Sequence, residues 1–136
     1  MFISKKPTIY IIDGTNFVRS CLNADGGNED AVTKEFLDFL DEVSRTETYS
    51  GSFFRVIFDG SYRPVGPTAR EALKVTFAES VTADELIYEQ AKYLHDHGER
   101  VAVVSSDRRL LEDAREAGVK TMFCQKFFNK LSAALE

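Results

Sequence analysis

Short apolar runs alternate with amphipathic stretches along this chain, and polar or glycine-rich segments separate them. The runs at residues 8–12, 53–58 and 100–105 are rich in β-branched and aromatic side chains and predict three buried strands. Residues 73–77 alternate apolar with polar side chains, which predicts a half-exposed strand and favours a place at a sheet edge. Residues 119–123 predict a last strand.

Apolar residues recur at helical spacing between these strands. The pattern predicts helices at 29–45, 82–97, 108–117 and 125–135, with Asn28 capping the first of them. Thr82 and Glu85 form a capping-box pattern, and Gly98 and Gly118 end two helices. Residues 13–28 and 60–68, which are rich in Gly, Asn and Pro, predict loops, and residues 49–52 predict a turn.

The order of these elements predicts the fold class. Strands that alternate with helices favour a mostly parallel central sheet covered by helices on both faces, which is a three-layer α/β/α fold. At 136 residues, without repeats or an internal linker, the chain is expected to form a single domain over residues 1–136.

Composition narrows the function classes. The content of 43% hydrophobic and 29% charged residues is ordinary for a globular protein, and no apolar run approaches the roughly 20 residues of a membrane span. Without a signal-peptide pattern, the expectation is a cytoplasmic protein with no membrane partner, whose two distant cysteines stay reduced. A net charge of −5 argues against coating nucleic acid by bulk charge but leaves room for a nuclease with a local basic rim. Candidates for that rim are Arg63, Arg70, Lys74, Arg108, Arg109, Lys126 and Lys130.

Four aspartates carry the candidate chemistry. Asp13, Asp59 and Asp107 each follow a predicted buried strand, and Asp84 opens a predicted helix. Ligands of open α/β sheets bind beyond the carboxyl ends of the strands, so these carboxylates are expected to gather there. Because like charges at close range repel, the pattern predicts a divalent cation among them and metal-assisted chemistry on phosphate.

Each aspartate also has a purely structural interpretation. Asp13-Gly14 and Asp59-Gly60 are typical of turns, Asp84 favours a helix dipole, and Asp107 is a good N-cap. No phosphate-binding glycine loop, dinucleotide fingerprint or nucleophile elbow occurs. Asp13-Gly14-Thr15 is also similar to the start of haloacid-dehalogenase-like phosphatases, but Ile11 stands where their nucleophilic aspartate would be.

Four segments together resemble a known group. They are Asp13-Gly14-Thr15-Asn16-Phe17, Val56-Ile57-Phe58-Asp59-Gly60, Val75 to Ile87 and Val103-Val104-Ser105-Ser106-Asp107. In this order and spacing they are similar to the NYN domains of the PIN-like superfamily, with the YacP-like ribonucleases as the branch of greatest likeness, from about Ile9 to Leu131.

The resemblance implies a PIN-like fold and a metal-dependent endoribonuclease. By this likeness Asp13, Asp84 and Asp107 would hold Mg²⁺ or Mn²⁺, with Asp59 and Asn16 also in the catalytic site. Arg63, Arg108 and Lys126 are the candidates for binding the RNA backbone, and the RNA would be mRNA or RNA on the ribosome. The alternative is a catalytically inactive PIN-like module that binds RNA or protein. The sequence leaves the oligomeric state open.

Overall fold

A six-stranded sheet forms the centre of the molecule in the computed structural model, which describes residues 6–136. The strands lie in the order β3-β4-β2-β1-β5-β6, and every neighbouring pair is parallel except β3 and β4. Their bounds are β1 (Thr8–Asp13), β2 (Phe53–Asp59), β3 (Ala69–Arg70), β4 (Leu73–Ala78), β5 (Arg100–Val104) and β6 (Lys120–Met122).

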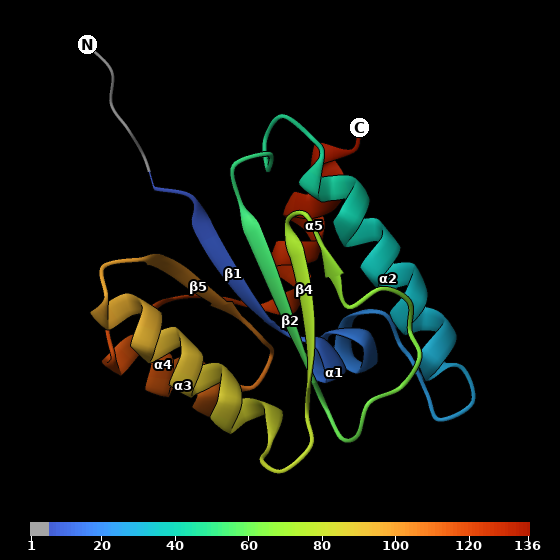
Figure 1. Cartoon of the computed structure of the whole chain (residues 1–136), viewed down its shortest axis with the longest axis horizontal. Coiled ribbons are helices and arrows are strands. Elements are labelled where there is room, and N and C mark those ends of the chain that lie inside the picture. Colours follow the sequence, from blue (N-terminus) through green and yellow to red (C-terminus); the bar gives the residue numbers. More distant parts are fainter. Residues whose placement is uncertain (1–5) are drawn as a thin grey trace.

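Helices cover both faces of this sheet, as Figure 1 shows. Helices α2 (Glu29–Ser44) and α5 (Cys124–Ala134) lie on one face, and α3 (Ala83–Asp96) and α4 (Arg108–Glu116) lie on the other. The short α1 (Gly14–Asn16) and the π-helical turn η1 (Phe17–Cys21) follow β1 directly. Among the described residues, no helix is both long and apolar enough to cross a bilayer.

Two apolar cores hold the three layers together. Ile11, Ile57 and Val103 point from the sheet toward α3 and α4, whereas Ile12, Phe58 and Val104 point toward α2 and α5. Adjacent residues of one strand serve opposite cores because strand side chains alternate between the two faces. All six are fully buried, which explains why these strands are apolar without interruption.

The predicted three-layer α/β/α fold is confirmed, and two local predictions are wrong. Residues 14–21 are helical rather than a loop, since Phe17 and Val18 are fully buried there against α2 and α5. Strand β4 is not at the sheet edge, because the two-residue β3 pairs with its beginning. Asn28 is the N-cap residue of α2 as predicted, but its side chain makes no capping bond and instead accepts a hydrogen bond from the backbone N–H of Asp25 at 2.8 Å.

Candidate functional site

Asp13 lies at the carboxyl end of the central strand β1 and is only 3% exposed. One carboxylate oxygen accepts a hydrogen bond from the backbone N–H of Asn16 at 3.2 Å, which caps α1. The other accepts a hydrogen bond from the hydroxyl of the fully buried Ser105 at 3.0 Å. Both oxygens are therefore held in place, and each keeps lone-pair capacity for a further partner.

Asn16 connects the ends of β1 and β5. Its side-chain oxygen accepts a hydrogen bond from the backbone N–H of Ser106 at 2.7 Å and a weaker one from the Cys124 thiol at 3.4 Å. Its amide nitrogen donates to the Ser20 hydroxyl at 3.3 Å. The predicted site residue Asn16 thus lies beside Asp13 and fixes the turn that leads to Asp107.

Asp59 ends β2 and joins two neighbouring segments. Its backbone N–H donates to the Thr15 hydroxyl at 2.9 Å, and one carboxylate oxygen accepts from the Ala83 N–H at 2.8 Å. The second bond satisfies an otherwise unpaired N–H at the start of α3. Asp59 therefore positions the first turn of α3, which contains Asp84.

Asp107 caps α4 and is also tied to the centre of the site. One of its carboxylate oxygens accepts hydrogen bonds from the N–H groups of Arg109 at 3.0 Å and Leu110 at 3.2 Å. Its own N–H donates to the Ser105 hydroxyl at 3.1 Å, the same hydroxyl that donates to Asp13. Ser105 thus holds Asp13 and Asp107 in one network.

The four carboxylates influence one another electrostatically. The pKa of Asp13 is raised to about 6, first by burial and then by the negative charges of Asp59 and Asp107, against two opposing hydrogen bonds. The pKa of Asp84 is raised to about 7, first by burial, then by repulsion from Asp13 and by a hydrogen bond with Asp107. The four predicted acids therefore share one site, where negative charge is costly.

The donor chemistry of this site fits a divalent cation. All four side chains offer carboxylate oxygens, which Mg²⁺ and Mn²⁺ prefer, and a positive ion would offset the repulsion that helps to raise the two pKa values. Within residues 6–136, however, no three His, Cys, Asp or Glu side chains already converge in a metal-holding group. The ligand set Asp13, Asp84 and Asp107 stays a prediction.

Comparison with known proteins places the chain in a family. The model of the YacP-like NYN domain matches residues 10–136. This chain belongs to the YacP-like NYN domain family. That family is one of ribonucleases. A comparison with curated proteins finds no match.

Two solved structures support the same fold for this NYN domain. Rae1 (YacP) from Bacillus subtilis superposes with a TM-score of 0.74 at 17% identity, over 93% of this chain and 74% of that one. A single-substitution variant of Rae1 gives a TM-score of 0.73 at 18% identity, over 93% of this chain and 76% of that one. The likeness confirms the predicted PIN-like fold.

The candidate RNA-binding side chains of this NYN domain differ in availability. Arg108 and Lys126 are exposed in the first turns of α4 and α5, and neither forms an ion pair with any described residue. Arg63 instead donates to the carbonyls of Asp59 and Ser61 and lies near Asp30. Those contacts give Arg63 a role in holding the loop after Asp59, while RNA binding by all three stays a prediction.

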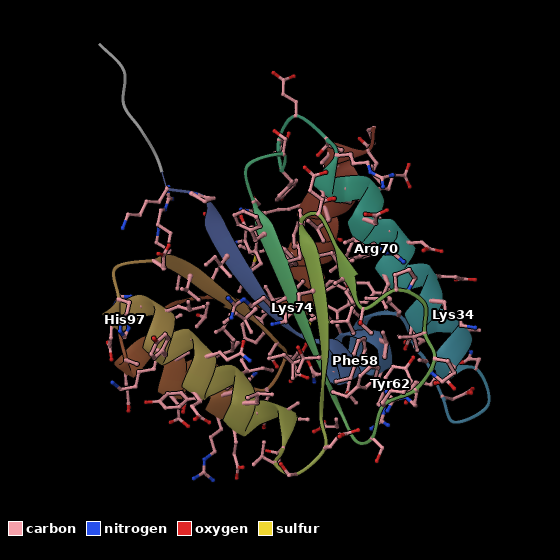
Figure 2. The ribbon with its side chains drawn as sticks, in the orientation of Figure 1. Lys34, Phe58, Tyr62, Arg70, Lys74 and His97 are labelled. Carbon is pink, nitrogen blue, oxygen red and sulfur yellow. The ribbon has the colours of Figure 1, made fainter. Side chains whose placement is uncertain are left out.

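Two members of the predicted basic rim lie away from the acids. Arg70 is in β3 and Lys74 is at the start of β4, whose carboxyl end is Ala78. Figure 2 shows Arg70 well separated from Tyr62, which follows the carboxyl end of β2. Arg70 also forms ion pairs with Asp38 and Asp41 of α2. Including these two residues in the rim was wrong, because Lys74 lies at the amino end of the parallel strand β4 and Arg70 pairs with that same end.

Sequence reasoning missed two residues that hold the NYN site together or border it. The Thr15 hydroxyl links α1 to Asp59, although threonine after Asp-Gly gives no signal of this contact. Arg19 lies near Asp59, which helps to raise the pKa of its guanidinium after the larger effect of its hydrogen bond with Glu29. Because residues 13–28 were predicted to be a loop, no helical periodicity indicated where the Arg19 side chain would lie.

The raised pKa of Asp84 predicts a pH-dependent stability. In the metal-free folded protein the pKa of Asp84 is about 7, whereas an unperturbed aspartate has a pKa of 3.8. Asp84 therefore makes its full contribution to the free energy of unfolding at low pH. That contribution is lost as the pH rises through about 7. We expect Asp84→Asn to raise the free energy of unfolding at pH 8 by about 1 kcal/mol, a value discounted because the carboxyl is partly exposed.

Urea unfolding at pH 5 and pH 8 in EDTA measures this effect. The matched control is Glu89→Gln, which removes an exposed charge from the same helix. If Asp84→Asn changed the free energy of unfolding by the same amount at pH 5 and pH 8, the shared electrostatic site would be contradicted.

Proposed function

We propose that this NYN domain is a divalent-metal-dependent endoribonuclease that hydrolyses RNA phosphodiester bonds beyond the carboxyl ends of the strands. Asp13, Asp84 and Asp107 would hold Mg²⁺ or Mn²⁺, with Asp59 and Asn16 supporting them. The observation that carries the proposal is the electrostatic coupling of four carboxylates at one sheet edge: burial and mutual repulsion raise the pKa of Asp13 to about 6 and that of Asp84 to about 7. Membership in a ribonuclease family supports phosphodiester hydrolysis as the reaction class.

A divalent ion held there would supply positive charge to stabilise the scissile phosphate and to lower the pKa of a water molecule. The residues of the chain position the reacting groups. Ser105 and the Asn16 N–H orient the carboxylate of Asp13, and Asp59 fixes the helix start that presents Asp84. Arg108 and Lys126 would contact phosphates that flank the cleaved bond in the RNA, for which we propose mRNA or ribosome-bound RNA.

Metal addition and removal test this function directly. We expect Mn²⁺ or Mg²⁺ to stimulate cleavage of single-stranded RNA and EDTA to stop it. At an ion concentration tenfold above its dissociation constant, binding should also add about 1.4 kcal/mol to the free energy of unfolding. Thermal unfolding of the whole chain with and without Mn²⁺ measures the second effect. Cleavage that persists unchanged in EDTA would overturn the metal role.

A second candidate is a PIN-like module that binds RNA or protein without turnover. It is favoured by one observation, that no three metal-binding side chains of residues 6–136 are already grouped. In that case Mn²⁺ would leave the unfolding temperature unchanged and RNA would stay intact, which separates the two candidates.

A further inference from the structure

Two aromatic side chains are exposed just beyond the carboxyl ends of the strands. Tyr62 follows the end of β2 by three residues and is 59% exposed, and Phe123 follows the end of β6 directly and is 46% exposed. Since parallel strands end at the same edge, both rings lie at the edge that also carries Asp13. At this edge the exposed rings are accessible to the flat face of a ligand, and aromatic rings favour offset-stacked or edge-to-face contacts.

The sheet order places these aromatics on opposite sides of the acids. Strand β1, which carries Asp13, lies between β2 on one side and β5 followed by β6 on the other. At about 4.8 Å between neighbouring strands, β2 and β6 are about 14 Å apart. A chain laid across this edge would therefore meet Tyr62, then the carboxylates, then Phe123.

Tyr62 is held firmly although its ring is exposed. Its N–H donates to the Glu79 carboxylate at 3.1 Å, which ties the loop after β2 to the segment before α3. Its ring packs edge-to-face on Phe77, with centroids 5.5 Å apart, and the Arg63 guanidinium lies over the same Phe77 ring. Because the ring is already positioned, little conformational entropy would be lost when a flat partner stacks on it. The Phe77 ring also stacks on Phe58 of β2, and Figure 2 labels Tyr62 and Phe58 in this part of the molecule.

Phe123 is also fixed by its place in the chain. Its carbonyl accepts the N–H of Phe127 in the first turn of α5, and the next residue, Cys124, contacts the Asn16 side chain. Lys126 is exposed in the same turn of α5. An exposed ring beside an exposed cation is the pairing that binds a nucleotide through its base and its phosphate.

We propose that Tyr62 and Phe123 are two base-stacking positions for the RNA substrate, with the phosphate between the stacked bases at the carboxylates. The proposal rests on the proposed function and adds two substrate-binding residues to it. Aromatic side chains can stack on bases only when these are unpaired and splayed out, so a continuous duplex would not engage both rings. The short span of three residues keeps Tyr62 within about 11 Å of Asp59, measured between Cα atoms.

Single tryptophan reporters can test the stacking. The chain contains no tryptophan, so Tyr62→Trp and Phe123→Trp each introduce one fluorophore. The matched control is Tyr93→Trp, because Tyr93 is 61% exposed but lies on α3 beside His97, away from the carboxyl edge. Each variant is titrated in EDTA with a short single-stranded oligoribonucleotide, with its duplex, and with an abasic oligonucleotide of equal charge.

We expect the single strand to quench fluorescence at positions 62 and 123 but not at position 93. The duplex and the abasic strand should quench neither site, since neither offers an unpaired base. Similar quenching at all three positions would overturn the proposal. Binding of the single strand without quenching at positions 62 and 123 would also overturn it. So would the absence of any binding.

Affinity supplies a second measurement. Tyr62→Ala should weaken single-strand binding by about tenfold, whereas Tyr62→Phe should keep it near the wild-type value because the ring remains. Cleavage separates this proposal from the proposed function. Metal-dependent cleavage without quenching would support the nuclease function and contradict base stacking on Tyr62 and Phe123. Quenching without cleavage would support the stacking and contradict the nuclease function.

Discussion

Asp13→Asn is expected to reduce metal-dependent RNA cleavage by about a hundredfold or more without unfolding the protein. The size follows from the loss of one charged group at the reacting centre, where single electrostatic contributions are worth about 10²–10³ in rate. The fold should survive, because burial and neighbouring charges raise the pKa of Asp13 to about 6 and make its charge costly at neutral pH. Asparagine keeps one oxygen as an acceptor and removes that cost.

The paired measurement is cleavage rate and unfolding temperature on the same preparation. Asp113→Asn is the matched control, because Asp113 is an exposed acid on α4 outside the carboxylate network. We expect the control to cleave at the wild-type rate. Cleavage by Asp13→Asn within a factor of about three of wild type would remove Asp13 from the catalytic group, and a large fall in its unfolding temperature would assign it a structural role instead.

The strands and most helices could be predicted because local pattern and tertiary burial agree. Runs such as residues 8–12 are apolar throughout because both faces of a central parallel strand are covered, and Thr82 caps α3 through the Glu85 N–H as its sequence pattern indicates. Residues 14–21 were mispredicted because Gly, Asn and Ser favour loops locally. Their helical geometry is set by the burial of Phe17 and Val18 in the core.

Part of the candidate site could also be predicted from the sequence, because it follows from the parallel arrangement of the strands. The ends of β1, β2 and β5 had to meet once the strands were parallel, which brings Asp13, Asp59 and Asp107 together. The link from the Asp59 carboxylate to the Ala83 N–H could not be predicted, since it depends on how the loop before α3 returns to the sheet. The direction of β3 and the place of Tyr62 likewise depend on tertiary contacts.

Gly14 shows how a single close approach supports the site. A Cβ atom at this position would lie 2.6 Å from the Phe58 ring and 2.8 Å from Val56, and both side chains are fully buried. The sequence pattern indicated that Gly14 allows a tight turn. In the structure, the absence of a side chain at Gly14 lets α1 pack closely against β2. The next residue, Thr15, accepts a hydrogen bond from the N–H of Asp59, so we expect a displacement of Gly14 to disturb this link between α1 and the end of β2.

Gly14→Ala is therefore expected to lower the free energy of unfolding by about 2–3 kcal/mol, the cost of overpacking a dense core. Gly26→Ala is the matched control, because a Cβ atom there would meet no heavy atom within 4 Å and the φ of Gly26 is not positive. Alanine there should stabilise the fold by up to about 1 kcal/mol through the unfolded chain. Urea unfolding of both variants measures the contrast. If Gly14→Ala matched Gly26→Ala in stability, the packing of Gly14 against Phe58 and Val56 would not exclude a larger side chain at this position.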